Sequence, residues 1–250
     1  MATEKTAGIV IKTFDAGESS TRAKILCKGL GKITVFARGA KNTKSRLLSA
    51  CQPFTYGEYM LFEGRDFYSV SQAEIKESFS GLRNDLKSLA YASYLAELTE
   101  KTVPEGMEAD DVLRLLYMAY EAMADGENDA ALAAVIFEIK YLQLSGLLAE
   151  DEFCASCGKE EENAHYFSCE SGGFVCRDCA RTVYDGMRIS DGAYMAIKYV
   201  LGTFGRKMFA FRVSDDVKKE LWNIFENYIK RHMCDNLKSL EFVKQCEILG

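Results

Sequence analysis

The sequence predicts a mixed α+β protein of several domains: a small N-terminal β-barrel, then a helical domain into which a cysteine module is inserted. Three observations predict this class. Strand-like segments fill the first 80 residues, apolar residues then recur at a spacing of three and four, and two Cys-x2-Cys pairs interrupt the helical pattern. The expected boundaries are 1–80 for the barrel, 81–250 for the helical domain and 153–180 for the module.

Five strands are expected in the first domain. Segments 22–27 and 32–38 alternate charged and apolar residues on either side of a glycine-containing turn, which indicates a hairpin. Residues 39–46 are polar and basic and are predicted to form a loop. The other three expected strands are 8–14, 52–62 and 66–73. Five short strands with no long helix between them favour a small closed or nearly closed barrel.

Apolar stripes of helical period follow the expected barrel. The stripes at 82–98 and 112–123 predict two helices, and the stripe at 130–144 is apolar on most sides, which predicts a buried helix. After the cysteine module, helices are expected at 193–201, 217–233 and 237–248. We expect these stripes to form the core of the helical domain.

The composition is that of a protein with buried cores. Of the 250 residues, 48% are hydrophobic and 27% are charged, which argues against disorder or a fibrous repeat. The longest apolar stretch, 130–137, has eight residues against the ~20 that a membrane-spanning helix needs, and no secretory signal pattern is visible. We expect a soluble cytoplasmic protein with no membrane partner. In that compartment the nine cysteines are expected to be thiols or metal ligands rather than disulfides.

Charge is distributed unevenly along the chain, although the net charge is −6. No acidic residue occurs from Ser19 to Gly57. Globular surfaces normally mix both signs, because a field of one sign repels itself. A basic run can be a solvated face without function, but here the cations lie on expected strands and a glycine-containing loop, which favours binding of a polyanion. The eight cations are Arg22, Lys24, Lys28, Lys32, Arg38, Lys41, Lys44 and Arg46.

The cysteine module has the spacing of a four-thiolate zinc site. Cys154 and Cys157 form one Cys-x2-Cys pair, and Cys176 and Cys179 form a second pair eighteen residues later. Gly158 permits the tight reversal after the first pair. Four sulfur ligands predict tetrahedral coordination of one Zn2+ ion, with no open position for water or substrate. The expected zinc is therefore structural and not catalytic.

Other assignments of the cysteines are weaker. Four buried thiols without a metal are unusual in a segment with so few aliphatic residues, and two disulfides conflict with the expected compartment. Cys169 is a fifth candidate ligand outside the pairs, and His165 is an alternative ligand within the module. The remaining cysteines are predicted to be core thiols: Cys27, Cys51, Cys234 and Cys246.

The common catalytic motifs are absent from the sequence. It contains no phosphate-binding G-x4-G-K-[ST], no complete dinucleotide fingerprint, no G-x-S-x-G and no H-E-x-x-H. The two histidines, His165 and His232, stand at positions that suggest no nucleophile–base pair, and nothing distinguishes any pair of carboxylates. The sequence therefore predicts a protein that is not an enzyme.

Several motifs occur together in a fixed order. They are GIVIKT from Gly8, GES from Gly17, GKI from Gly31, ARGA from Ala37, KSR from Lys44, QPFT from Gln52, the glycine pair before Cys176 and LKSLEF from Leu237. In this order the chain resembles the bacterial RecO family of recombination mediators over nearly its whole length. The order is far more specific than any single motif. The family includes members without the cysteines, whereas this sequence keeps all four.

The resemblance implies an OB-fold for the barrel and a zinc module in the helical domain. It also implies binding of single- and double-stranded DNA, annealing of complementary strands, and work with RecR and single-stranded-DNA-binding protein to load the recombinase RecA. A cytoplasmic, nucleoid-associated protein is expected on this basis. OB-folds hold nucleic acid with a basic groove and aromatic platforms. The candidate platforms are Phe36, Tyr56, Tyr59 and Phe62, about half of which we expect in the core.

Three functions remain to be compared at this point. The first is a DNA-binding recombination mediator that anneals strands. The second is an adaptor whose zinc module and acidic helices contact protein partners, with DNA contact incidental. The third is a hydrolase or nuclease, which requires divalent-metal-dependent turnover of DNA.

Overall fold

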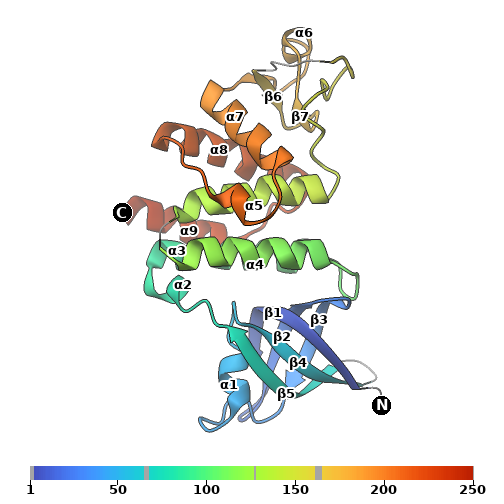
Figure 1. The fold of residues 1–250 in the computed structure, drawn as a ribbon, viewed down its shortest axis with the longest axis vertical. Helices are drawn as coiled ribbons and strands as arrows, with labels where there is room; N and C mark the ends of the chain where they lie inside the picture. The colour runs from blue at the N-terminus through green and yellow to red at the C-terminus, as the bar shows by residue number, and fades with distance from the viewer. Residues whose placement is uncertain (1–2, 65–67, 127, 161–164, 250) are drawn as a thin grey trace. The chain divides into compact units, whose positions relative to one another are not determined.

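A computed structural model describes residues 3–64, 68–126, 128–160 and 165–249 (Figure 1). By its internal contacts the chain divides into two compact units, one of residues 1–126 with 237–250 and one of residues 127–236. The division into functional domains at residue 80 stays a prediction. Among the described residues, no helix combines the length and apolar character needed to cross a membrane.

The first unit contains a closed barrel of five strands within the described residues, in the order β1-β2-β3-β5-β4. Neighbouring strands are antiparallel, except that β3 and β5 run parallel. The expected hairpin is confirmed, with Lys24 opposite Thr34 and Ile25 opposite Ile33. The start of the strand expected at 66–73 lies outside the described residues. The strands are β1 Thr3–Asp15, β2 Thr21–Cys27, β3 Gly31–Ala37, β4 Tyr56–Glu63 and β5 Tyr68–Glu77.

Alternating residues of the strands fill the barrel, as a period of two requires. Ala23, Ile25 and Val35 are fully buried in one cluster with Val10 and Leu61. Tyr59 belongs to the same cluster, and its hydroxyl donates to the carbonyl oxygen of Ala50 at 2.8 Å.

A short helix closes one end of the barrel, between the predicted loop at 39–46 and the predicted strand at 52–62. This helix, α1 Arg46–Ala50, begins where the side chain of Ser45 accepts a hydrogen bond from the backbone of Leu47. Residues 52–55 are not part of β4, because the chain turns at Phe54, whose φ is 72°. Five residues are too few for a periodic signal, which explains why the sequence did not reveal the helix.

The sequence predicted helices at 82–98, 112–123 and 237–248, and the structure has four helices there, because the first stripe forms two. The stripe at 82–98 is divided by Asp85, whose side chain caps α3 by accepting from the backbone of Ser88 at 2.7 Å. The terminal helix packs on α3, where Ser239 donates both its N–H and its hydroxyl to one carboxylate oxygen of Glu97. The helices are α2 Gly81–Asn84, α3 Leu86–Thr102, α4 Asp110–Ala124 and α9 Lys238–Leu249.

The turn between β2 and β3 lies against the loop that joins α3 to α4. Gly106 donates its N–H to the carbonyl oxygen of Lys32 at 2.9 Å. Gly31 approaches so closely that a Cβ atom on it would lie 1.8 Å from the carbonyl oxygen of Met107. Only glycine fits this contact, because its φ of 65° is also in the left-handed region.

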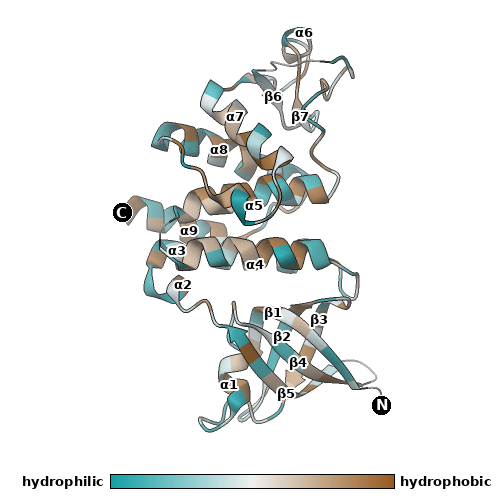
Figure 2. Cartoon of the chain, viewed as in Figure 1, coloured by the Kyte–Doolittle hydropathy of each residue, from teal (hydrophilic) through white to brown (hydrophobic). Residues whose placement is uncertain are grey.

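The second unit is helical and carries the cysteine module. As predicted, α5 is buried on nearly all sides, and its apolar colouring is visible in Figure 2. It packs on α7 and α8, and the module adds a small sheet in the order β7-β6-β8. The elements are α5 Ala130–Leu144, β6 Tyr166–Ser168, β7 Gly173–Phe174, α6 Arg177–Ala180, β8 Met187–Arg188, α7 Asp191–Gly202, the 3-10 helix Gly205–Phe209 and α8 Asp215–His232.

Substitution of Gly31 by alanine tests the close approach. Gly29→Ala is the matched control, because Gly29 also has a positive φ but nothing lies within 4 Å of an added Cβ. We expect the control to lose about 1–2 kcal/mol of unfolding free energy from backbone strain alone. Gly31→Ala should lose about 1 kcal/mol or more beyond that, because the loop must move. Urea denaturation measures both, and equal losses contradict the contact.

Candidate nucleic-acid interface and metal centre

A row of side chains crosses the outer face of the barrel. Phe14 of β1 pairs with Arg22 of β2, and Arg22 pairs with Phe36 of β3. Directly opposed residues of an antiparallel pair lie on the same face of the sheet. The neighbours Ala23 and Val35 point into the barrel core, so this row points outward. A cation is thereby placed between two aromatic rings on adjacent strands. We call Phe14, Arg22 and Phe36 the ring–cation row.

Exposed cations occur at the start of β2, in the loop that follows β3 and at the first residue of α1. Arg38, Lys44 and Arg46 are exposed, as is Arg22. The loop is built from turns, since Asn42 donates its N–H to Gly39 and accepts from the backbone of Ser45. Arg38 directly follows Ala37, which pairs with Thr21, so it stands at the end of the ring–cation row. Arg46 instead lines a separate hollow against β4 and β5, with Glu58 and Met60.

Lys41 has a different position from the other loop cations. Its ammonium group lies 2.8 Å from a carboxylate oxygen of Asp15 and donates to the carbonyl oxygen of Gly17 at 3.0 Å. Its backbone N–H donates to Ser19. Lys41 thus ties the β1–β2 loop to the loop after β3, and its charge is already compensated.

Three lysines of the barrel surround Glu100 of α3. Lys24 lies 2.5 Å and Lys12 lies 3.3 Å from its carboxylate oxygens, and Lys32 donates to its backbone carbonyl oxygen. Burial opposes ionisation of Glu100, but the hydrogen bond from Lys24 and the charges of Lys12 and Lys24 outweigh it and lower its pKa below the ordinary value. Burial lowers the pKa of Lys32. These lysines hold the barrel to α3.

Further acidic residues contact the part of the β2–β3 hairpin that lies near its turn. Thr34 donates its hydroxyl to Glu105 at 2.7 Å, and Gly29 donates its N–H to Asp110 at 2.7 Å. The exposed Lys28 stands in this turn, beyond the end of β2 that is farthest from Arg22. The outer face of β2 and β3 is therefore divided into two halves. The covered half, with Lys24, Lys32 and Thr34, contacts acidic residues of α3 and the loop after it, and the open half carries Arg22 and Phe36.

The structure thus separates the predicted DNA-binding residues. It places Arg22, Phe36 and Arg38 at the open end, with Lys41 and the loop that carries Lys44 beside them, whereas Arg46 lies against β4 and β5. The expectation that Lys24 and Lys32 face a ligand needs correction, because both are engaged with Glu100 and Lys32 is buried. Lys28 lies at the opposite end of the hairpin.

The aromatic candidates also separate. Tyr59 is a core residue, and Tyr56 packs edge-on against Tyr117 of α4 with ring centroids 4.9 Å apart. Tyr56 therefore belongs to the contact between barrel and helix rather than to the open face. Phe62 is 39% exposed on β4. The sequence analysis missed Phe14, which only the pairing register of β1 with β2 could have revealed.

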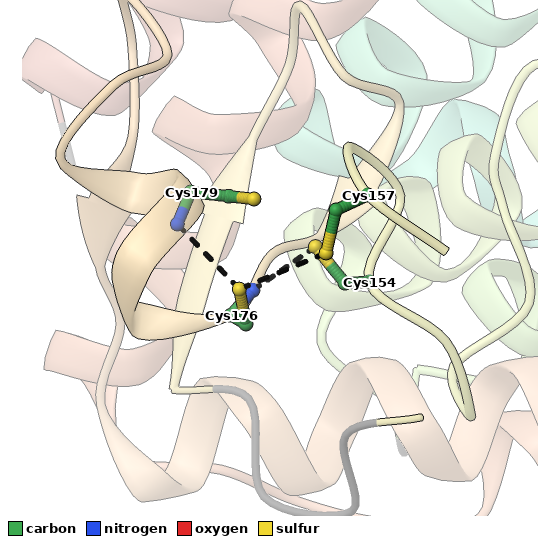
Figure 3. Close-up of side chains that lie close together, drawn as sticks. All are labelled: Cys154, Cys157, Cys176 and Cys179. Carbon is green, nitrogen blue, oxygen red and sulfur yellow. Dashed lines mark hydrogen bonds between the residues drawn. The ribbon is translucent and has the colours of Figure 1, made fainter. Parts of the chain in front are cut away.

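The four cysteines of the module converge on one point (Figure 3). Their Sγ atoms all lie within 4.8 Å of one another, which is the arrangement that can hold a metal ion. The N–H of Cys176 donates to the sulfur of Cys154 at 3.3 Å, and the N–H of Cys179 donates to the sulfur of Cys176 at 3.5 Å. Part of the segment between the pairs, 161–164, lies outside the described residues.

The sulfurs of the cluster differ in acidity. A hydrogen bond with Ser156 favours the thiolate of Cys179, but hydrogen bonds shared with the neighbouring thiols outweigh it and raise the pKa of Cys179 to about 12, whereas the pKa of Cys154 is lowered. Burial opposes ionisation of Cys154, but N–H donors from Cys176, Cys157 and Ser156 outweigh it and lower its pKa to about 6. By contrast, burial raises the pKa of Cys51 to about 11. A set of four sulfur donors fits a soft or borderline divalent metal ion.

The other expected candidates lie outside the cluster. Cys169 is buried against α8, with its sulfur 3.7 Å from the carbonyl oxygen of Ile224, and burial raises its pKa to about 11. His165 lies beside Asp191, at 3.3 Å. Cys27, Cys51 and Cys246 are buried, as core thiols should be, and Cys234 is partly exposed.

The module is attached to α8 through one carboxylate. Asp185 accepts from the hydroxyl of Ser168, from the N–H of Glu170 at 2.9 Å and from Arg231 of α8 at 2.9 Å. A carboxylate that satisfies three donors fixes the orientation of the pieces that carry them. The cysteine cluster is thereby held in a set position within the second unit.

These features define a class: a mixed α+β protein with an N-terminal barrel, a helical C-terminal part and a four-cysteine cluster. The family models described as recombination protein O N terminal and recombination protein O C terminal match residues 1–79 and 83–241. The chain therefore belongs to the RecO family, and it is a protein of DNA repair.

Similar proteins named "DNA repair protein RecO" cover nearly the full chain. That of Acetivibrio thermocellus is 32% identical over 240 residues, which is 96% of this chain and 96% of the relative. That of Alkaliphilus metalliredigens is 34% identical over 242 residues, 96% of this chain and 98% of the relative. That of Desulforamulus reducens is 34% identical over 240 residues, 96% of this chain and 93% of the relative.

Glu100→Gln tests the junction between barrel and α3. The loss of the buried negative charge that faces Lys12 and Lys24 should lower the unfolding free energy by about 1–3 kcal/mol at pH 7. Because the folded pKa of Glu100 is lowered, this contribution is complete above the ordinary glutamate pKa of about 4.3 and disappears as pH falls through the folded value. Urea denaturation from pH 7 to pH 3 measures it.

Glu108→Gln is the matched control for that experiment. Glu108 lies exposed in the loop after α3 and carries the same charge. We expect a change within about 0.5 kcal/mol at all pH values. A loss for Glu100→Gln that persists unchanged at pH 3 contradicts a role for its charge.

Proposed function

We propose that this protein is a recombination mediator that binds single- and double-stranded DNA and anneals complementary strands. With RecR, it helps to load RecA onto DNA coated with single-stranded-DNA-binding protein. The observation that carries the proposal is the ring–cation row on the open half of the barrel, in a chain of the RecO family. The partners follow from membership of the family.

The barrel is best assigned as an OB-fold. In support, its strand order is β1-β2-β3-β5-β4, β3 is parallel to β5, and a helix lies between β3 and β4. OB-folds bind nucleic acid on the face of strands 2 and 3 and on the loops between strands 1 and 2 and between strands 4 and 5. Arg22 and Phe36 lie on that face, next to the first of these loops.

Annealing on this surface needs no bond chemistry, and we propose no enzymatic activity. The exposed arginines and lysine neutralise phosphates and release their counterions, which is largely independent of base sequence. The rings of Phe14 and Phe36 stack on bases, at about 1–3 kcal/mol for each stacked base. Two complementary strands held with their charge screened can pair and then leave, because a duplex cannot stack its bases on the rings.

The cysteine cluster is proposed to bind one structural Zn2+ ion through Cys154, Cys157, Cys176 and Cys179. Four thiolates leave no position for a reactive water, so the ion supplies folding free energy rather than catalysis. The packing around the cysteines supports this role, since the buried cluster there is small, with Cys154, Val175 and Cys176, while Phe167 and Phe174 of the module pack against rings of α7 and α8. Binding to DNA places the protein on the nucleoid, in the cytoplasm.

Charge reversal tests the DNA surface. Arg22→Glu and the pair Arg38→Glu with Lys44→Glu should each weaken binding of a single-stranded oligonucleotide at least about tenfold at low salt. With Arg22, Arg38 and Lys44 as the exposed cations of this surface, log K for the wild type should fall against log[salt] with a slope of about −2. Fluorescence anisotropy measures both quantities.

Lys28→Glu is the control for Arg22→Glu. Arg22 is near the start of β2 and Lys28 directly follows its end. Both undergo the same charge change, but Lys28 stands at the covered end of the hairpin. We expect less than a threefold effect. Equal losses for the two variants, or no loss for either, contradict the assigned surface. Tight protein-partner binding without DNA affinity supports the adaptor, and Mg2+-dependent cleavage of labelled DNA supports a nuclease.

Metal analysis tests the cysteine cluster. The purified protein should contain one zinc ion per chain, and Cys176→Ser should lose it together with the cooperative unfolding of the second unit. Cys169→Ser is the control, because Cys169 is buried outside the cluster. It should retain the ion. Zinc retained by Cys176→Ser, or lost equally by both variants, contradicts the assignment.

A further inference from the structure

A hollow lies at the mouth of the barrel, beside the ring–cation row. Its volume is about 340 Å³, within the range of about 300–1,000 Å³ that small-ligand sites span. It is lined by the end of β1, the start of β2, the end of α1 and the residues that follow it. The lining residues are Thr13, Phe14, Asp15, Thr21, Lys41, Leu48, Cys51 and Gln52.

The strand register explains which side chains enter this hollow. Thr13 pairs with Ala23, which points into the barrel core, and Thr21 lies two residues before Ala23. Both threonines therefore share the inward face at the open end of the barrel. Phe14 points outward from the same strand and forms the rim, so the hollow and the ring–cation row meet at one residue.

The hollow carries no net charge. Asp15 and Lys41, its only ionised lining residues, form an ion pair at 2.8 Å. A phosphate would meet no unpaired cation there, since Lys41 already has two oxygen partners. The site therefore suits a neutral, flat and partly polar group rather than a phosphate.

Hydrogen-bonding groups in the hollow are unused. Within the described part of the chain, the hydroxyls of Thr13 and Thr21 make no hydrogen bond to protein. Gln52 donates one N–H to the carbonyl oxygen of Leu48 at 3.3 Å, which leaves its own carbonyl oxygen as an acceptor. Leu48 and Cys51 add apolar surface beneath these groups. The combination of donors, acceptors and an apolar floor matches the edge and faces of a nucleobase.

We propose that the barrel mouth binds one unpaired nucleobase of a DNA strand that lies across Phe14, Arg22 and Phe36. This inference rests on the proposed function and deepens it. Phosphates of the strand contact the cations outside the hollow, while one base turns inward past Phe14. A base in a duplex cannot enter, because it is stacked and paired. The site therefore favours single strands and releases a strand once it is paired.

Isosteric removal of the two hydroxyls tests the site. Thr13→Val with Thr21→Val keeps the shape of the mouth and removes two of its free polar groups, the threonine hydroxyls. We expect binding of a dT oligonucleotide to weaken about fivefold to tenfold, with binding of a duplex of the same length unchanged within twofold. Thr34→Val is the control, because Thr34 points outward on β3 and bonds Glu105. It should bind both DNAs like the wild type.

An abasic oligonucleotide of the same length separates base binding from phosphate binding. The wild type should prefer the dT strand to the abasic strand, and the double variant should lose part of that preference without binding the abasic strand more weakly. Equal weakening on dT, duplex and abasic DNA, or no weakening on dT, overturns the proposal. If the wild type binds none of these DNAs, the proposed function itself fails.

Discussion

The contact of Glu100 with three barrel lysines decides which cations of the barrel remain available to bind a ligand. The carboxylate takes up the charge of Lys12 and Lys24, and its backbone carbonyl holds Lys32. The loop after α3 then adds Glu105 against Thr34. As a result, one half of the β2–β3 face is joined to the protein's own helices, and the other half is left open.

The second unit depends on a different constraint. Its cysteine module has little apolar core of its own, yet its sulfur atoms converge and its backbone N–H groups point at them. Asp185 then joins the module to α8 through Arg231. In the proposed function, a metal ion held by the four sulfurs adds folding free energy to this module.

Much of the fold was predictable because its signals are local. The hairpin followed from alternation around a glycine turn, and the buried helix α5 followed from an apolar stripe on nearly all sides. The cysteine cluster followed from spacing, which reports the geometry of a knuckle directly. By contrast, α1 is too short to show a period, and the packing of α9 on α3 joins segments 142 residues apart at Ser239 and Glu97.

The candidate DNA surface was predictable only in part, because it depends on contacts between residues that are far apart in the sequence. A run without acidic residues locates cations along the chain, but it does not show which of them a distant carboxylate will neutralise. Lys24 and Arg22 are two residues apart on one strand, yet only Lys24 reaches Glu100. Likewise, aromatic residues alone did not distinguish Tyr56, which packs on Tyr117, from Phe36 on the open face.

Photo-crosslinking tests the central claim most directly. A single-stranded oligonucleotide that carries 5-iodouracil is bound to the full-length protein and irradiated, and the crosslinked residues are identified by mass spectrometry. The division of the barrel face predicts crosslinks at Phe14 or Phe36. Crosslinks confined to the loop at 104–109, to Tyr56 or to the second unit contradict it.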